Sequence, residues 1–435
     1  MSKTTMTREF AEVATLLGHG LPRLEEGDEV LTQSRIPTLE DARRLLSRAD
    51  TDARRLRAET FFDAIRYREG LGQGLHDRGE AAVFAEGEIP TSDATGHARH
   101  FPLRAQMLSV AEKTVSAGEA MDLSVDRAFW GVGPKEELYS IVNIGTLTLE
   151  PGARLIVRGD VLSFVCQRLV LLDHPFGDAG SEHGAHIAIL PSPAPLDDRK
   201  GSVYGAPGAP GPCGKNGCDG SVSVQPEGLL GSLLPQDIDR NAMHGENGDD
   251  GRPGLQGGRG RNGGMAKLAE LTVRSLADPS VPLVVLARGG RGGDGGCGGD
   301  GGEGGAGGAG AEGGVGFDGP VPGGGGGDGG DGGAGGDGGH PGNGGLASNV
   351  YITVPPEDAE HVVAISVAGA PGRPGEPGKP GRGGRPGAGG GPPENAGPDG
   401  TEGKDGASGK PGRLGRRRLP PAMFVNDRPA AGARG

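Results

Sequence analysis

The sequence has few aromatic residues, few cysteines and no long apolar run. Aromatic side chains make up 3% of the 435 residues, so large conventional cores are not expected along the whole chain. Four cysteines are too few for a disulfide scaffold. No stretch reaches the ~18 consecutive apolar residues that a membrane-spanning helix needs, so we expect no membrane span.

Charge and the first residues argue against two further classes. The chain has 57 acidic residues and 44 basic ones, and its net charge of -13 disfavours a general nucleic-acid binder. Residues 1–9 contain no basic region followed by an apolar one, so we expect no cleaved secretory signal. The expected location is the cytoplasm, or a site reached by non-classical export or by assembly into a particle.

Glycine dominates what is present. The chain holds 91 glycines and 35 prolines, far outside ordinary globular usage. From Gly289 to Gly345 glycine recurs every third residue and usually stands twice per triplet, as in Gly292-Gly293-Asp294. A period of three fits a left-handed polyproline II helix, which makes no internal hydrogen bonds. Such a tract must stay solvated, join a triple helix, or fold back and bond to copies of itself.

Three further tracts keep the threefold period, at 205–220, 245–264 and 369–415. Short β-rich segments stand between the tracts, at 268–273, 281–286, 350–354 and 361–367. Strand and glycine tract therefore alternate, which predicts a β core that glycine-rich excursions leave and rejoin.

Two helices are predicted near the N-terminus. The first covers residues 7–17, and the second begins at Thr38, with Asp41 three residues on, and continues to Ile65. One side of the second helix is rich in arginine: Arg43, Arg44, Arg48, Arg54, Arg55 and Arg57. That side could dock an acidic partner or phosphate. We favour a solvated face that pairs locally with acidic neighbours, namely Glu40, Asp50, Asp52 and Glu59.

A pattern of period two begins at Leu103. Its clearest part, Ile144 to Asp160, contains two short strands that flank Pro151-Gly152, and a third strand follows from Val161 to Leu172. Strands this short and closely spaced suit the rungs of a parallel β-helix, or else a sandwich.

The expected fold class is therefore mainly β with polyproline or polyglycine II helices. It comprises a short N-terminal α-helical segment, a β-helix or sandwich core, and a polyglycine II bundle. The expected domains are a helical segment over 1–80, a β-helix-like core over 100–200, alternating strands and polyglycine II tracts over 201–415, and a basic tail over 416–435.

The central tract favours a bundle over a triple helix. Residues 369–390 keep a strict Gly-X-Y pattern with proline and are collagen-like. The Gly-Gly-X tract over 289–345 has almost no proline, and its paired glycines leave two bare faces where neighbouring runs can approach and hydrogen-bond. The third residue of each triplet then forms a carboxylate stripe, which we predict as a binding surface: Asp294, Asp300, Glu303, Asp328, Asp331 and Asp337.

The C-terminal tract is basic where the central tract is acidic. Its cations include Arg373, Lys379, Lys404, Lys410 and Arg416. We expect the two tracts to pack side by side and supply each other's counter-charge. The alternative is a solvated basic tail for a polyanionic partner.

In period and composition these four tracts resemble glycine-rich polyglycine II and collagen-like proteins. The group includes snow-flea antifreeze-type bundles, the tip adhesins of some bacteriophage tail fibres, and the N-terminal domain of Obg GTPases. The carboxylates of the stripe are unlike an ice-binding face, and no P-loop signature is present. The resemblance to the adhesins implies a rigid platform whose exposed loops contact a surface polymer.

Candidate metal ligands are few. The densest group comprises Asp173, His174, Asp178, Glu182, His183 and His186, and its candidate ligands are Asp173, His183 and His186. His183 and His186 could share one ion only on a turn or helix, and no third ligand has diagnostic spacing, so an ordinary polar loop is the preferred interpretation. The acidic tracts resemble calcium-binding nonapeptide repeats but lack their large apolar residue between Asp328 and Asn343. We therefore expect no cofactor and keep calcium as the alternative. Arg158-Gly159-Asp160 is an integrin-type tripeptide that we attribute to chance.

Geometry limits how the cysteines can pair. On one extended run Cys213 and Cys218 would lie roughly 15 Å apart, whereas a disulfide needs Cα atoms about 4.4–6.8 Å apart. They could pair across a turn or with another run, such as the one that carries Cys297. Four free thiols are the preferred interpretation.

No catalytic triad, nucleotide fingerprint or paired metal motif is present in the sequence. We therefore expect a non-enzymatic structural or surface-binding protein, adhesin-like, acting at a cell surface or within a larger assembly. Its expected partners are a surface polymer or other protein subunits. One alternative is a β-helix enzyme that cleaves polysaccharides with paired carboxylates. Another is a homotrimeric collagen-like stalk, which the oligomeric state would reveal.

Overall fold

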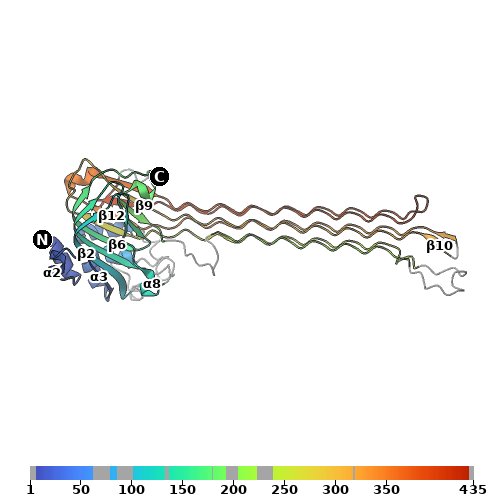
Figure 1. Cartoon of the computed structure of the whole chain (residues 1–435), viewed down its shortest axis with the longest axis horizontal. Helices are drawn as coiled ribbons and strands as arrows, with labels where there is room; N and C mark the ends of the chain where they lie inside the picture. Colours follow the sequence, from blue (N-terminus) through green and yellow to red (C-terminus); the bar gives the residue numbers. More distant parts are fainter. Residues whose placement is uncertain are drawn as a thin grey trace.

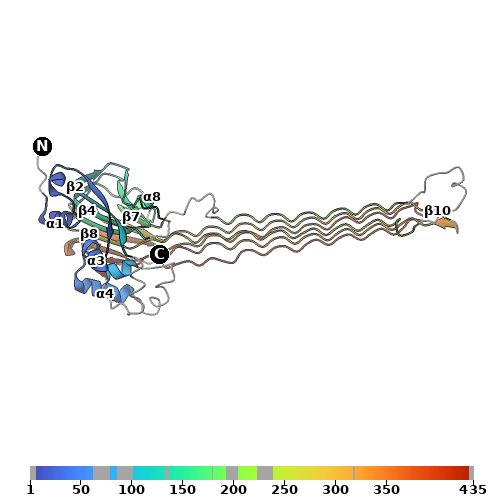
Figure 2. The same ribbon diagram turned by 90° about the horizontal axis from the view of Figure 1, so that it is seen from below.

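The computed structural model describes residues 6–61, 79–85, 101–132, 137–178, 180–192, 204–222, 239–316 and 319–430. They form a head of helices and two sheets, and a long rod that leaves one side of the head (Figures 1 and 2). Both ends of the described chain lie in the head, and the glycine tracts form the rod.

The first predicted helix is confirmed as α1, Arg8–Leu16, which begins where the side chain of Thr7 accepts the amide of Phe10. The second is two helices instead of one. α3, Leu39–Leu46, is capped by Thr38 as expected, but the chain becomes extended at Ser47, with φ -94° and ψ 131°, before α4, Thr51–Phe61. Residues 62–65 lie outside the described ranges. Three short helices complete the described set: α2, Leu21–Glu25; α6, Gly79–Phe84; and α8, Arg127–Trp130.

The larger sheet has eight strands in the order β1-β2-β4-β6-β8-β12-β14-β15. Its interior pairs are parallel, and only β1 with β2 and β14 with β15, at the two edges, are antiparallel. The strands are β1, Val30–Ile36; β2, Leu103–Val115; β4, Tyr139–Leu149; β6, Val161–Leu171; β8, Ala269–Val273; β12, Val350–Thr353; β14, Met423–Val425; and β15, Arg428–Pro429. Residues 423–429, expected in a basic tail, therefore belong to the sheet.

The smaller sheet has five parallel strands in the order β13-β9-β7-β5-β3. Its strands are β3, Ala120–Asp122; β5, Arg154–Arg158; β7, Ile187–Leu190; β9, Leu283–Arg288; and β13, Val362–Val367. The chain alternates between the two sheets from β2 to β9, so the Pro151-Gly152 turn carries it from one sheet to the other. Gly152 has φ +73° there, a value that favours glycine.

Both faces of the larger sheet are buried. Its inner face packs against the smaller sheet, where Val142, Phe164 and Leu271 meet Leu155 and Val285 in one apolar cluster. Its outer face is covered by the N-terminal helices in a second cluster, which includes Val13, Leu46, Phe84, Tyr139 and Tyr351. Burial on both faces explains the almost continuous apolar character of these strands.

The expected fold class is wrong. The described residues form an α/β fold, with a large and mostly parallel sheet, a second parallel sheet and six α-helices. The helices were expected as a separate segment, yet they are a layer that the outer face of the sheet requires. The glycine tracts contain no helix among their described residues and, apart from β10, Gly314–Gly316, and β11, Gly319–Val321, no strand. We expected polyproline or polyglycine II helices to define the fold class, whereas the two parallel sheets and the helices define it.

The rod is an array of six extended runs, which we number 1 to 6 in chain order: 205–220, 245–264, 289–313, 323–345, 369–390 and 397–415. Runs 1, 3 and 5 are parallel and hydrogen-bonded in that order, as are runs 2, 4 and 6. Consecutive runs are antiparallel, so every hydrogen bond between the set of runs 1, 3 and 5 and the set of runs 2, 4 and 6 joins two runs of opposite direction. The array thus has two layers of three runs.

The two layers continue the two sheets of the head. Runs 2, 4 and 6 lead into β8, β12 and β14, which are neighbours in the larger sheet. Runs 3 and 5 leave from β9 and β13, which are neighbours in the smaller sheet, and run 1 follows β7 in the chain. The order of strands in each sheet is therefore the order of runs in each layer.

The number of neighbours explains the two glycine patterns. Runs 3 and 4 each bond to four other runs and have the pattern Gly-Gly-X, whereas runs 1 and 6 bond to two and have Gly-X-Y. A Cβ atom on Gly295 would lie 2.1 Å from the carbonyl oxygen of Gly339, and one on Gly296 would lie 2.0 Å from that of Ala206. Both glycines of a central triplet therefore face backbone that leaves no room for a side chain.

Two adjacent alanine substitutions in run 4 test this packing. A Cβ on Gly326 would lie 2.0 Å from the backbone oxygen of Gly387, whereas one on Gly325 meets first a side-chain atom, His244 Nδ1, at 3.2 Å. We expect Gly326→Ala to destabilise the rod by about 1–3 kcal/mol. Gly325→Ala should cost clearly less, because a side chain can move. Equal thermal midpoints for the two variants, measured by calorimetry, would contradict the packing.

Candidate functional site

The six carboxylates predicted as one binding stripe lie on two separate surfaces. Asp294, Asp300 and Glu303 belong to run 3, and Asp328, Asp331 and Asp337 belong to run 4. These are the central runs of opposite layers, and their glycines face the neighbouring runs. Their side chains therefore leave the array in opposite directions, and no single surface presents all six.

Five of these carboxylates bond to the next run of their own layer. Asp294 and Asp300 accept the backbone amides of Arg373 and Lys379 at 2.7 and 2.8 Å. Asp328, Asp331 and Asp337 accept those of Thr401, Lys404 and Lys410, each at 2.7 Å. Asn and Asp side chains elsewhere in the rod do the same: Asn216, Asp219, Asn247, Asp250, Asn262 and Asn343. These side chains therefore bond neighbouring runs within each layer to one another.

The acidic central tract and the basic C-terminal tract are neighbours, as expected from their charges. Backbone hydrogen bonds join these runs. In addition, the backbone amides of four cationic residues donate to carboxylates of the neighbouring run, namely those of Arg373, Lys379, Lys404 and Lys410. The ion pair between Arg291 and Asp294, at 2.9 Å, lies within a single run. A charge-assisted amide bond holds the geometry of the backbone more firmly than an exposed pair of flexible side chains.

Acid should weaken the bonds between Asp328 and Thr401. The pKa of Asp328 lies below its ordinary value because Thr401 donates both its backbone amide and its hydroxyl to the carboxylate. The unfolded chain therefore binds the proton more tightly, so the contribution to stability is full above the unfolded pKa of about 3.9 and is lost as pH falls through the lower folded pKa.

We expect Asp328→Ala to lower the thermal midpoint of the rod at about pH 7. Asp328→Asn is the matched control, since its amide oxygen accepts the same N–H but does not titrate. The difference between the wild type and the Asn variant should shrink between about pH 5 and pH 2. A difference that does not depend on pH would show that the carboxylate charge is irrelevant to this bond.

The candidate metal ligands do not converge. His186 accepts the amide of Val284 on Nδ1 at 3.1 Å and donates from Nε2 to the carbonyl of Asp173 at 3.0 Å, so both ring nitrogens are used by the backbone. Burial also lowers the pKa of His186. His183 is exposed beside Glu182. Within the described ranges no group of three or more His, Cys, Asp or Glu residues is placed to hold a metal ion.

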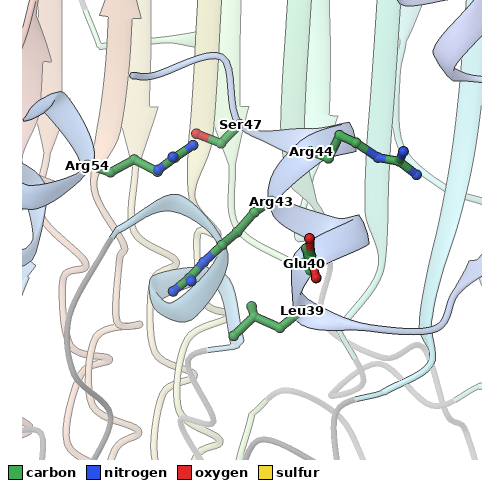
Figure 3. Close-up of a pocket in the computed structure, with 6 residues that line it drawn as sticks. All are labelled: Leu39, Glu40, Arg43, Arg44, Ser47 and Arg54. Carbon is green, nitrogen blue, oxygen red and sulfur yellow. The ribbon is translucent and has the colours of Figure 1, made fainter. Parts of the chain in front are cut away.

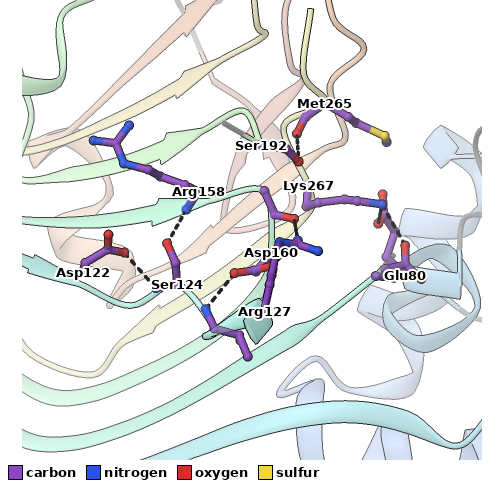
Figure 4. Close-up of polar contacts among 12 residues, drawn as sticks. Glu80, Asp122, Ser124, Arg127, Arg158, Asp160, Ser192, Met265 and Lys267 are labelled. Carbon is purple, nitrogen blue, oxygen red and sulfur yellow. Dashed lines mark hydrogen bonds and ion pairs between the residues drawn. The ribbon is translucent and has the colours of Figure 1, made fainter. Parts of the chain in front are cut away.

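The integrin-type tripeptide is part of the head and is not displayed. Asp160 is 1% exposed, pairs with Arg127 at 2.6 Å, and accepts the amide of Val125 at 2.8 Å (Figure 4). Burial raises the pKa of Asp160 to about 6, against the opposite effect of the Arg127 charge. Arg158 pairs with Glu182 at 2.9 Å. The motif therefore fixes the turn between β5 and β6.

A buried cluster of two carboxylates and one ammonium lies where run 2 enters the head (Figure 4). Lys267 Nζ lies 3.1 Å from Glu137 and 3.7 Å from Glu80, and the hydroxyl of Ser348 donates to Glu80. Burial raises the pKa of Glu137 to about 8 and that of Tyr139 still further, although the Lys267 charge acts in the opposite sense on Glu137. Glu80 is fully buried, and the side chains of Glu137 and Lys267 are each 11% exposed. The cluster therefore links α6 to the residues before β8, and its carboxylates are not placed to contact a polymer.

A second buried ion network joins the N-terminal helices to the C-terminal strands. Arg57 of α4 is 2% exposed and lies 3.2 Å from Glu270 and 2.8 Å from Asp427. Its guanidinium also lies 4.1 Å from the ring centroid of Tyr351. Sequence reasoning placed Arg57 on a solvated face, and no periodic signal distinguishes it from the exposed arginines beside it.

Replacing Arg57 by alanine should therefore cost about 3–5 kcal/mol, because it leaves Glu270 buried without its cation. Arg55→Ala on the same helix is the control. Arg55 is exposed and 3.5 Å from Asp52, so its loss should cost no more than about 1 kcal/mol. Urea denaturation of the full chain measures both, and similar losses for the two variants would exclude a special role for Arg57.

An open concavity of about 610 Å³ lies beside α3 and α4 (Figure 3). It is lined by Leu39, Glu40, Arg43, Arg44, Ser47 and Arg54. Three of the arginines that sequence analysis placed on one helix face thus line a single depression. The break between the two helices at Ser47, which the sequence pattern did not reveal, creates its wall.

Two of the connections between runs lie, in the described part of the chain, at the end of the rod farthest from the head (Figures 1 and 2). The hairpin of β10 and β11 joins run 3 to run 4, and a turn at Gly391, where φ is +96°, joins run 5 to run 6. Residues 223–238, between runs 1 and 2, lie outside the described ranges. The sequence pattern placed the reversal of the chain at Pro320-Val321-Pro322. Gly316 pairs with Gly319 in the structure, so the chain reverses just before that site, and Pro320 and Val321 lie on the returning strand β11. Side chains here are not required for the packing of runs, so this distal tip is the part of the rod most open to variation.

All four cysteines are free, which confirms the preferred interpretation. Cys166 is buried in the head, whereas Cys213, Cys218 and Cys297 are exposed on the rod. None of the helices within the described residues is long and apolar enough to cross a membrane. Neither a family model, a curated protein nor a solved structure matches the chain.

Proposed function

We propose that the protein is a non-enzymatic structural protein, adhesin-like, that recognises a surface polymer with the distal tip of its rod. One observation carries this proposal. Both described connections between runs that do not pass through the head, from run 3 to run 4 and from run 5 to run 6, lie at the far end of the rod. A run such as 289–313 spans at most roughly 80 Å, so the rod holds these loops well away from the head.

The rod suits this role because its stiffness needs few apolar side chains. Its central runs are joined to four neighbours by backbone hydrogen bonds that recur every third residue. The likeness in period to tail-fibre tip adhesins supports the same conclusion. A glycan is the target class that we favour, with the head attached to a carrier or to other subunits of a larger assembly.

Two alternatives are less well supported. A polysaccharide-cleaving enzyme needs two accessible carboxylates across a groove, whereas Glu80 is fully buried, Glu137 is 11% exposed, and both surround Lys267. A collagen-like stalk needs three chains, whereas the glycines of these tracts already face runs of the same chain. Sedimentation of a monomer would exclude the stalk, and the absence of turnover on a polysaccharide panel would exclude the enzyme.

Charge reversal at the tip tests the proposal. Glu394 is exposed in the turn between runs 5 and 6, and Glu357 is exposed in the head. In pull-down assays on insoluble polysaccharides and whole cells, we expect Glu394→Arg to weaken binding about tenfold. Glu357→Arg, the same change in the head, should bind like the wild type. The proposal fails if the wild type binds no surface, or if the two variants bind equally well.

A further inference from the structure

The concavity beside α3 and α4 gathers positive charge on an acidic protein. Its lining contains three arginines and one glutamate, although the whole chain has a net charge of -13. A depression with a local excess of positive charge concentrates anions from solution. The chemistry of the lining therefore selects an anionic ligand.

Ser47 gives a second and independent sign of a ligand. The residue is 6% exposed, and its hydroxyl has no hydrogen-bond partner among the described residues. Its backbone amide closes α3 by donating to the carbonyl of Arg43 at 3.2 Å, which fixes the residue in the wall of the concavity. A buried hydroxyl without a partner costs free energy that a ligand oxygen would recover.

The three arginine side chains that line the concavity are each held by a contact within the protein. Arg54 donates to the carbonyl of Ala49 at 3.1 Å, Arg43 to that of Ala85 at 3.4 Å, and Arg44 pairs with Asp41 at 3.2 Å. In Figure 3 the hydroxyl of Ser47 faces the end of the Arg54 side chain, so one ligand oxygen between them would meet both.

We propose that this concavity is an oxyanion site, with Ser47 and Arg54 as its inner ligands and Arg43 and Arg44 at its rim. A planar guanidinium binds a carboxylate or a phosphate with paired N–H bonds, and the serine hydroxyl donates a further one. An acidic side chain of a partner protein and a free phosphate ion offer this same chemistry. The site lies in the head and does not depend on what the rod tip recognises.

The test is calorimetric titration of the full chain with two probes, inorganic phosphate and a polyglutamate peptide. We expect Ser47→Ala and Arg54→Gln each to weaken binding at least about tenfold. Arg55→Gln is the matched control, because Arg55 is on the same helix but exposed and paired with Asp52, and it should bind like the wild type. Ser47→Ala should keep the thermal midpoint, since it removes a hydroxyl that has no partner.

The outcomes separate the sources of the ligand. Tighter binding of polyglutamate than of phosphate identifies an acidic partner segment, and binding of phosphate alone identifies a free ion. Both support the site. If the wild type binds neither probe at millimolar concentration, or if Ser47→Ala binds like the wild type, the proposal is wrong. If Arg54→Gln fails to fold, comparing the affinities of Ser47→Ala and Arg55→Gln for the two probes still tests the proposal.

Discussion

The rod depends on how closely two backbones can approach when neither carries a Cβ atom. Each central run donates amides to the carbonyls of two neighbours and accepts from the others, and the contact distances exclude even a methyl group at both glycines of a triplet. Glycine loses more conformational freedom on folding than any other residue, and these runs bury little apolar surface in return. The array is therefore stabilised by many repeated hydrogen bonds, to which the carboxylates and amides of Asp and Asn add a further set.

The head supplies what glycine cannot, namely a fixed starting register. Two parallel sheets share an apolar core, and their strands are placed in the same order as the runs that extend from them. β8, β12 and β14 receive the runs of one layer, and β9 and β13 start runs of the other. Helices and the two buried ion clusters around Arg57 and Lys267 then lock the outer face of the larger sheet. The rod is in this sense a continuation of the head in which side-chain packing gives way to backbone bonding.

Much of this arrangement was predictable from local pattern, because each run and strand has its own period. The tract limits, the strands around Pro151-Gly152 and the helix at 7–17 agree with the structure. The reversal expected at Pro320-Val321-Pro322 lies a few residues earlier, before Gly319. The fold class was not predictable from the sequence, because only the three-dimensional contacts show that the helices cover a sheet. Sequence pattern also did not predict the split of the carboxylates between two layers, the break at Ser47 or the burial of Arg57 and Asp160, because these features too depend on contacts in three dimensions. Periodicity locates a residue along a run or a helix but does not say which neighbours surround it.

The threefold pattern also sets how the rod can change in length. Consecutive runs are antiparallel and every third residue is bonded to the adjacent runs, so a single inserted residue would turn all later side chains of that run toward the wrong neighbours. A whole triplet added to both arms of one hairpin, at the distal tip, preserves every bond nearer the head. The length of the rod can therefore change only in steps of one triplet per arm. Each hairpin at the tip can be lengthened or shortened independently of the others. Such a molecule can reshape its far end by small insertions while the register fixed in the head stays unchanged.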